Sequence, residues 1–552
     1  MFIVSQHQIP ISINISIVDK IYLKLENNQI LIGNRKLANF NFENGFKETR
    51  IVYEFLSLPF AEPPIGEKRF KNAFRLQRIL TSDIYNATYA RYACMQPRNI
   101  LTASNLNYSE DCLYFNIWVP VTNDQDELLY TNQSKLYSND LSKLKYINNS
   151  FIFGKTENVE KKSTMFWIHG GGYVYGSSND EAYDGTVLSS IENVIVAGSN
   201  YRLGVFGFLY LNDSRVSDNI ALNDQLLAIE WYKEKYVDFF GGFTNNICLF
   251  GESAGAMSIR MLMFSKKNYL FNRVILKSFF NVSYTSPQDA YHRSINYLKN
   301  GSCLEANFDI RTQKLTDSTF DCLMKIDAQS LIRTGEMLYP TSDFVNEDQT
   351  LNLDILFGFN QNENKIFLYL AFSGSYINPI EQDLENLNSD STIYDNKFAN
   401  DRIIEFFTEV PRTYLTCVNR YYSSNTSLFL NDFYNGTVDY NLNRMENLNL
   451  NSRRKAWDKI SKITSDLNFN CPAIQFRKKT KTNGKIYQYK FNRRSSFNQN
   501  PRWLGVTHSD AIPFVYGQPF ILSNFKMIDQ LDRNLSSMIM NYFANFAKSG
   551  KL

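Results

Sequence analysis

Long apolar runs are missing from this 552-residue sequence: no window reaches about 18 consecutive apolar residues, the length that a membrane-spanning helix needs. A readable secretory signal is also missing, because the first ten residues lack a basic segment and a sustained apolar core. Neither sign of charge dominates, since 58 Lys and Arg face 55 Asp and Glu for a formal net charge of +3. No basic block alternates with aromatic residues, so nucleic-acid binding has no support.

Cysteine is scarce, with seven residues in the whole chain, and an odd number leaves at least one unpaired or paired outside the chain. Cys248 falls in an apolar stretch, where a buried and inert thiol is expected. Cys417 and Cys471 have no obvious partner. Two pairs lie 18 and 19 positions apart in polar, loop-like stretches and are plausible disulfides, namely Cys94 with Cys112 and Cys303 with Cys322.

N-x-S/T sequons are frequent and would suit a secreted glycoprotein, although an Asn-rich chain produces a share of them by chance. The eleven sequons begin at Asn14, Asn86, Asn107, Asn132, Asn148, Asn212, Asn281, Asn300, Asn425, Asn435 and Asn534.

Apolar residues are plentiful: 44% of the chain is hydrophobic and 20% charged, the balance of a globular protein with a large core. Short apolar stretches indicate buried strands, and stretches with helical periodicity, such as 223–236, lie between them. This alternation predicts an α/β fold with a large central, mostly parallel sheet and flanking helices. The strands are expected at 109–120, 164–168, 193–199, 247–250, 273–278, 353–357 and 485–491.

Three other regions differ from this pattern. The first fifty residues are expected to form a small β ribbon, because residues 21–25 alternate like a strand and 31–33 offer a partner. Residues from about 121 to 163 are polar and aperiodic, which indicates a solvated insertion. Residues from about 378 to 462 are polar with scattered helical patterns, which indicates a helical cap region.

The stretch around Ser253 carries the clearest chemistry. Ser253 is the centre of a G-x-S-x-G motif, and its flanking glycines Gly251 and Gly255 leave room for a sharp turn. The four residues before the motif are apolar and β-prone, and the residues after it favour helix. A strand-to-helix junction is the context that a nucleophilic serine of this kind needs. Without that context the motif is common by chance in loops rich in Gly and Ser.

A serine nucleophile needs a general base, and the chain has four histidines. His7 lies in a terminal tail, His292 in a helical pattern, and His169 before three glycines, so elimination leaves His508. It follows Ser253 in the chain, as the base does in the α/β-hydrolase order.

The acid that orients such a histidine must be a carboxylate. Glu363 lies between Ser253 and His508, just past an apolar strand, where side chains converge at the carboxyl ends of strands. Asp354 begins that strand instead. Asp510 is only two residues from His508 and is better explained by a hydrogen bond within the loop.

A glycine run follows the strand at 164–168. His169 and the three glycines after it match the loop that supplies backbone N–H groups to an oxyanion hole, to which Ala254, the residue after the nucleophile, adds another donor. A triple glycine alone is a weak signal, because phosphate-binding loops are also rich in glycine. The chain has no G-x-x-x-x-G-K-[ST] motif beside it, which argues against a phosphate loop.

These motifs together resemble the type-B carboxylesterase and cholinesterase family of α/β-hydrolases, from about residue 55 to 548. Residues 109–116 resemble one family signature and 251–255 the other, and four further motifs lie in the right order at 200–204, 223–225, 239–242 and 506–517. The resemblance implies one domain over 1–552, a triad of Ser253, Glu363 and His508, and an oxyanion hole of Gly171, Gly172 and Ala254.

The resemblance also implies structural links between distant segments. The pairs Cys94 with Cys112 and Cys303 with Cys322 align with the two small-loop disulfides of the family. Cys471 resembles a cysteine whose family partner lies further towards the C-terminus than Leu552, which suggests a truncated C-terminal part. The implied ion pairs are Arg69 with Glu110 and Arg202 with Asp224.

Several residues depart from the family pattern. Thr102 stands where cholinesterases carry the tryptophan that holds a quaternary ammonium group, and Ile366 replaces an aromatic residue of the same site. Choline-ester specificity is therefore not expected. Lys277 and Phe279 flank Ser278 where the family usually has Gln and Gly, which leaves the surroundings of Glu363 open.

The leading hypothesis is a serine carboxylester hydrolase that works through an acyl-enzyme on a small-molecule ester, with no metal or cofactor. The alternative is a catalytically silent, neuroligin-like adhesion or scaffold protein on the same fold. Such relatives typically lose a triad residue, whereas this chain keeps all three. The resemblance implies a secreted or extracellular protein, with a cytoplasmic one as the alternative. The motifs encode neither the natural ester nor the oligomeric state.

Overall fold

The computed structural model describes residues 9–25, 29–98, 106–121, 160–279, 284–300, 303–304, 308, 315–332, 338–367, 461–462, 464–524 and 528–552. Most of the expected insertion at 121–163 and of the expected cap at 378–462 lies outside these residues, as do His7, Thr102 and Cys417.

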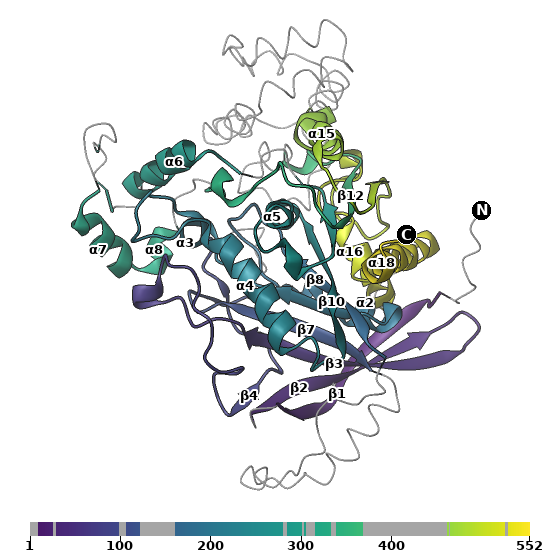
Figure 1. Ribbon diagram of the computed structural model, residues 1–552. Helices are drawn as coiled ribbons and strands as arrows, with labels where there is room; N and C mark the ends of the chain where they lie inside the picture. The colour runs from purple at the N-terminus through teal and green to yellow at the C-terminus, as the bar shows by residue number, and fades with distance from the viewer. Residues whose placement is uncertain are drawn as a thin grey trace, which may run out of the picture.

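Among the described residues, one large sheet of eleven strands organises the molecule (Figure 1). Along the sheet, the first four pairs of neighbouring strands, from β1 to β9, are antiparallel. The next five pairs, from β9 to β13, are parallel. In sheet order the strands are β1 (Ser12–Lys24), β2 (Ile30–Asn41), β3 (Lys47–Pro59), β7 (Tyr114–Val121), β9 (Ile195–Ser199), β8 (Lys162–Ile168), β10 (Gly242–Glu252), β11 (Arg273–Lys277), β12 (Asp354–Asn360) and β13 (Ile486–Phe491).

Three short strands complete the β structure. The strand β4 (Ile84–Asn86) pairs with β2 in parallel at the side of the sheet. The strands β5 (Ala93–Cys94) and β6 (Tyr108–Ser109) form a separate two-stranded ladder. The α/β architecture with a large, mostly parallel central sheet therefore agrees with the expectation from sequence.

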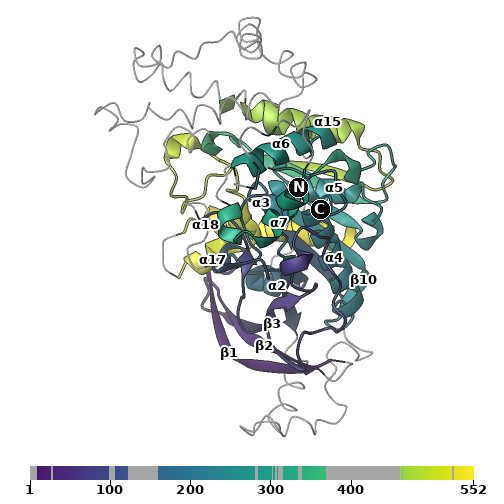
Figure 2. The ribbon, with the colours of Figure 1, turned by 90° about the vertical axis from the view of Figure 1, so that its left-hand side faces the viewer.

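The N-terminal strands correct one expectation. The antiparallel pair β1 and β2 forms as predicted, with Leu23 opposite Leu31. It is not a separate ribbon, because β3 pairs with β2 on one side and with β7 on the other, where Tyr53 lies opposite Val119. The second half of β3 is almost entirely buried, which suits a strand inside the sheet rather than one in a free ribbon. Figures 1 and 2 both show β1–β3 at the end of the molecule far from α15 (Cys471–Lys479).

Helices cover both faces of the sheet, which explains why its central strands are apolar on both sides. In β8, Phe166 and Ile168 belong to one core cluster, and Met165 and Trp167 belong to the other. The first cluster takes in α4 (Ile220–Lys235) and α5 (Ala254–Met263). The second takes in α2 (Thr186–Glu192), α16 (Ile512–Val515), α17 (Gln518–Leu522) and α18 (Gln530–Ser549).

The remaining described helices are short or peripheral. They are α3 (Gly204–Phe208), α6 (Pro287–Asn300), α7 (Asp317–Lys325), α8 (Ala328–Leu331), η1 (Gly66–Lys68), η3 (Glu181–Tyr183), η4 (Asn268–Leu270), η5 (Ser342–Phe344), η7 (Asp466–Asn470) and η8 (Arg502–Leu504). Of the helices in the described ranges, none is both long enough and apolar enough to cross a membrane.

Candidate active site

Ser253 lies at the sharp turn between β10 and α5. Glu252 ends the strand, Ala254 begins the helix, and Ser253 has a φ of 58° and a ψ of −127°. A positive φ is costly for a residue with a side chain and is kept where the surroundings enforce it. A Cβ atom at Gly255 would lie 2.1 Å from the carbonyl oxygen of Ile168, so the turn can press against β8 only with glycine there. The turn has the geometry that the motif predicts.

Glu363 and His508 meet near the carboxyl ends of β12 and β13. His508 Nδ1 lies 2.7 Å from Glu363 Oε2, across 145 positions of sequence. Both side chains are buried, and that of Glu363 has no exposed surface. Glu363 Oε1 also accepts hydrogen bonds from the Ser278 hydroxyl at 2.5 Å and from the Asn360 backbone N–H. The carboxylate is therefore fixed in place and holds one nitrogen of the imidazole.

The other imidazole nitrogen faces a second carboxylate. His508 Nε2 lies 3.2 Å from Glu252 Oε1, and the Ser509 hydroxyl donates to the same oxygen at 3.0 Å. Burial lowers the pKa of His508, but Glu252 and Glu363 together outweigh burial, and the pKa is raised above 6.5. Since Glu252 precedes Ser253 directly, these contacts bring the imidazole to the turn that carries the serine.

Two aromatic rings flank the imidazole of His508. The ring centroids of Phe367 and Phe469 lie 4.9 Å and 5.4 Å from that of His508. Rings at these distances pack against the imidazole.

The glycine loop after β8 lies against the serine. A Cβ atom at Gly170 would lie 3.2 Å from the Cβ atom of Ser253. Gly171 and Gly172 follow with φ values of 108° and 62°, which favour glycine. Ala254 is the first residue of α5, where backbone N–H groups have no acceptor within the helix. The predicted N–H donors thus come from two segments that meet at Ser253.

His169 has a structural role beside the glycine loop. Its ring is buried and stacks on Tyr201 at 4.3 Å, and the Tyr201 hydroxyl donates to the His169 carbonyl at 2.8 Å. Burial lowers the pKa of His169 to about 4, so it is neutral at physiological pH.

Three further residues have the side chains of a base or an acid, but their surroundings assign them different roles. His292 is exposed on α6. Asp354 begins β12 and contacts Arg273 at 3.3 Å. Asp510 accepts hydrogen bonds from the Thr507 backbone and the Asn498 amide.

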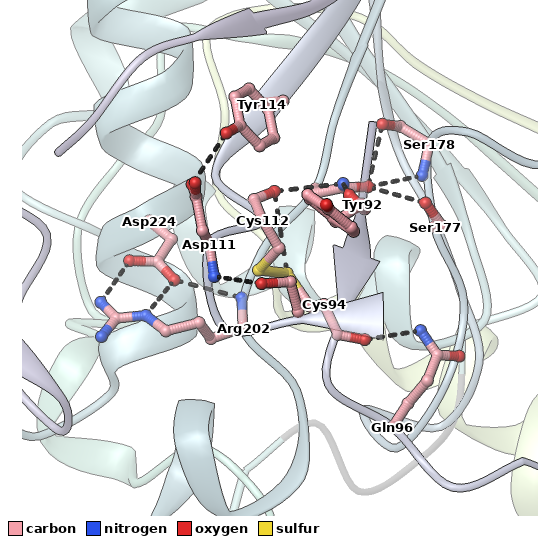
Figure 3. The surroundings of a disulfide bond; sticks show 12 residues. Tyr92, Cys94, Gln96, Asp111, Cys112, Tyr114, Ser177, Ser178, Arg202 and Asp224 are labelled. Atoms are coloured by element: carbon pink, nitrogen blue, oxygen red, sulfur yellow. Dashed lines mark hydrogen bonds and ion pairs between the residues drawn. A yellow bond between two sulfur atoms is a disulfide. The ribbon is translucent and has the colours of Figure 1, made fainter. Parts of the chain in front are cut away.

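Figure 3 shows the disulfide between Cys94 and Cys112 with Gln96 beside it. Gln96 connects this disulfide to the segment that follows the glycine loop. Gln96 donates to the carbonyl oxygens of Cys94 and Gly176 at 3.0 and 2.9 Å, and its side-chain oxygen accepts from the Gly176 N–H. Asn200, at the end of β9, donates to the Cys112 carbonyl. The second expected disulfide, Cys303 with Cys322, is also present. Both predicted pairings are therefore confirmed.

The two ion pairs that the resemblance implies are also present. Arg202 holds Asp224 through two bonds of 2.6 and 2.8 Å, and Arg69 holds Glu110 through bonds of 2.5 and 2.7 Å. Cys248 is buried and free, as expected.

The resemblance implied a partner for Cys471 beyond Leu552, and the structure corrects this expectation, because Cys471 is disulfide-bonded within this chain. The departures Lys277 and Phe279 do not prevent the bond from Ser278 to Glu363.

Sequence reasoning missed two parts of the site. Glu252 was part of a motif, and nothing in the local pattern placed it against His508. Ser278 has a φ of 51° and follows β11 directly, so its hydroxyl reaches Glu363 through a local turn that apolar periodicity does not reveal. Within the described ranges, no group of three or more His, Cys, Asp or Glu side chains is arranged to hold a metal ion.

A serine at a strained strand-to-helix turn, near a buried histidine and carboxylate on a mostly parallel sheet, defines the α/β-hydrolase class. Within it, the sequence profile of the Carboxylesterase family matches residues 42–551, and the chain belongs to this family.

Among curated relatives, acetylcholinesterase 1 of Caenorhabditis briggsae is 30% identical over 540 residues, which are 90% of this chain and 75% of the relative. Cholinesterase of Mus musculus is 29% identical over 537 residues, with the same shares of the two chains.

Proposed function

We propose that this protein is a serine carboxylester hydrolase in which Ser253 attacks the ester carbonyl and His508 accepts the serine proton. Glu363 holds the imidazole in the required tautomer and stabilises its protonated form. The observation that carries the proposal is the 2.7 Å contact between His508 Nδ1 and Glu363 Oε2, in a chain whose Ser253 lies on a strained elbow.

The reaction proceeds through an acyl-enzyme. The Ser253 oxygen bonds to the carbonyl carbon, the N–H groups of Gly171, Gly172 and Ala254 stabilise the oxyanion, and His508 passes the proton to the departing alcohol. Water then attacks the acyl-enzyme with His508 again as the base, and the carboxylic acid leaves. Glycine residues at 171 and 172 support this role, because their main chain can approach the substrate oxygen closely.

The substrate that we propose is a small carboxylic ester without a choline group. The relatives are named acetylcholinesterases and a cholinesterase. Ile366 stands where the family resemblance implies an aromatic residue, and an aliphatic side chain offers no π face to a quaternary ammonium group.

Secretion and glycosylation belong to the same proposal. Two disulfides and the exposed sequon residues Asn14, Asn107 and Asn212 support an oxidising, extracellular environment.

The test uses purified full-length protein with p-nitrophenyl acetate and with a fluorophosphonate probe. We expect turnover, and labelling at Ser253, that are both lost in Ser253→Ala. The matched control is Ser258→Ala, which removes a buried hydroxyl of α5 that accepts a hydrogen bond from the Gln225 amide. Absence of labelling in the folded wild-type protein, or undiminished turnover in Ser253→Ala, would refute the proposal and favour the silent adhesion protein.

The ester class is tested with acetylthiocholine against a neutral thioester of similar size. We expect kcat/KM to favour the neutral thioester, and a preference for acetylthiocholine would contradict the proposed class.

A further inference from the structure

Lys277 lies in a row of side chains that crosses four strands beneath the site. It ends β11 and lies in parallel register with Glu252 of β10 on one side and Gly358 of β12 on the other. Tyr489 of β13 follows Gly358, and its ring fills the space that a Cβ atom at Gly358 would take. Neighbours in register on parallel strands point to the same face. The Lys277 side chain therefore lies on the same face as Glu252, towards the elements that carry His508.

The backbone of Lys277 is also tied to the site. Its carbonyl oxygen accepts a hydrogen bond from the Ser253 N–H at 3.0 Å, and the next residue, Ser278, donates to Glu363. Its side chain is 1% exposed, and within the described part of the chain its Nζ has no hydrogen-bond partner. A buried ammonium group without such a partner costs folding free energy that an apolar residue would not cost.

The charges around His508 explain what this ammonium group can do. Burial lowers the pKa of Lys277 to about 8 against the attraction of Glu252 and Glu363, so the side chain is mostly protonated at neutral pH. Glu252 and Glu363 raise the pKa of His508, and Lys277 lowers it. The titratable groups that face these residues from the neighbouring elements are Glu252, Glu363, Tyr175, Tyr183, Tyr489 and Asp510.

None of these other groups supplies positive charge. Burial raises the pKa values of the three tyrosines, which stay neutral. Burial raises the pKa of Asp510 to about 6, so at neutral pH it adds negative charge, with Arg494 as its neighbouring cation. Within the described part of the chain, Lys277 is the cation whose charge opposes the carboxylates at His508.

We propose that Lys277 is a positioning residue of the site: its buried ammonium group partly offsets the negative charges of Glu252 and Glu363 and thereby favours the neutral form of the His508 imidazole. This role rests on the proposed function, because a general base must be unprotonated before it can accept the serine proton. Without the ammonium group, the two carboxylates hold a proton on the imidazole up to a higher pH.

The experiment compares four variants in the full-length protein. Lys277→Met and Lys277→Gln remove the charge with side chains of different polarity, and Lys277→Arg keeps it. Lys36→Met is the matched control, because Lys36 is also buried but lies at the other end of the sheet. The first measurement is kcat/KM for p-nitrophenyl acetate as a function of pH.

In the profile of kcat/KM against pH, the acid limb is the rise in activity as His508 loses its proton, and the alkaline plateau is the constant region above it. We expect Lys277→Met and Lys277→Gln to shift this acid limb to higher pH by about 0.5–1 unit, with the alkaline plateau within a few-fold of wild type. Lys277→Arg and Lys36→Met should leave the limb in place. An unshifted limb in both neutral variants, a shift to lower pH, or an equal shift in Lys277→Arg would each overturn the role. So would a loss of activity at every pH without a shift, because a purely structural residue would act in that way.

The second measurement does not depend on activity. The His508 ring is titrated by NMR in protein labelled at histidine, with its resonance assigned by comparison with His508→Gln. The pKa of His508 should rise in Lys277→Met and Lys277→Gln and stay in Lys36→Met, and an unchanged pKa would refute the electrostatic role. If the wild-type protein neither turns over esters nor reacts with the fluorophosphonate, the proposed function fails while this titration still decides on Lys277.

Discussion

Lys36 and Lys277 are both buried in the same sheet, but their ammonium groups differ in hydrogen bonding. Lys36 in β2 donates to Glu54 and, at 2.8 and 3.2 Å, to Asp184 and the Thr186 hydroxyl, so each of its three protons has an acceptor. Lys277 in β11 has carboxylates nearby, but in the described part of the chain its Nζ makes no hydrogen bond.

The pKa values of the two lysines record this difference. Burial lowers both, but for Lys36 the attraction of Asp184 and Glu54 is stronger and the pKa is raised, whereas for Lys277 burial dominates and the pKa falls to about 8. Lys36 therefore stabilises the fold in its charged form, and Lys277 does not. The charge of Lys277 is therefore kept at a cost to stability, at the edge of the candidate site.

Lys36→Met should change the free energy of unfolding more than the other variants do, because it removes the lysine whose three protons all have acceptors. Lys36→Met leaves Glu54 buried without its cation, and removal of one partner from a buried ion pair typically costs about 3–5 kcal/mol. Urea unfolding at pH 7 should show this loss, while the acid limb of kcat/KM stays unchanged. Asp184→Asn should cost much less, because that carboxylate is 31% exposed. An equal loss in both variants would show that Lys36 is not held mainly by Glu54.

Lys277→Met should have the opposite effect on stability. The folded pKa of Lys277 is about 8 and its ordinary value is 10.5, so the unfolded chain binds more protons between these values, and the burial penalty is relieved as pH rises from about 8 to 10.5.

At pH 7, where the penalty is fully present, Lys277→Met should raise the free energy of unfolding by up to roughly 3 kcal/mol. The gain should shrink above pH 8 and vanish near 10.5. Urea unfolding at pH 7, 9 and 10.5 tests this, and a clear loss of stability at pH 7 would remove the contrast with Lys36.

Ser278→Ala tests the carboxylate that faces His508, because it removes one hydrogen-bond donor from Glu363. Glu363, like Glu54, is held by fixed donors, and a hydrogen bond to a charged group contributes about 1.5–3 kcal/mol. The Ser278→Ala variant should therefore lower kcat/KM about 10-fold on the alkaline plateau. The acid limb should move little, which is the reverse of Lys277→Met. A limb that moves as far as in Lys277→Met would mean that the two residues act on His508 in the same way.

Much of the fold and of the candidate site could be predicted from local patterns. The strand before Ser253 and the glycines beside it lie within ten residues, and the alternation of apolar strands with helices required no long-range information. Four histidines left few choices for the partner of Glu363, and the structure brings His508 to it. The two small-loop disulfides were also predictable from short separations.

The row that joins Glu252, Lys277 and Tyr489 could not be predicted in this way. It depends on the order and register of strands that lie up to 237 positions apart, and neither is encoded in the periodicity of one strand. The same reason explains the first fifty residues, since β3 pairs with its sequence neighbour β2 and also with β7, which lies more than fifty positions further along the chain. The sequence identified Lys277 only as a departure from the family pattern. It did not show that Lys277 lies near the carboxylates of Glu252 and Glu363.

The smallest expected effect concerns Ser509, whose hydroxyl donates to the Glu252 oxygen that faces His508. Without this donor the oxygen attracts the imidazolium more strongly, so Ser509→Ala should raise the acid limb by about 0.2–0.3 unit, less than Lys277→Met. Ser509 has a φ of 70°, so Ser509→Gly removes the same hydroxyl and also relieves the backbone, which should make it about 1 kcal/mol more stable than Ser509→Ala. If the two Ser509 variants share the same acid limb but differ in stability, the limb shift comes from the lost hydroxyl and the stability difference from backbone strain. A limb shift as large as that of Lys277→Met would instead assign the balance of charge to the hydroxyl.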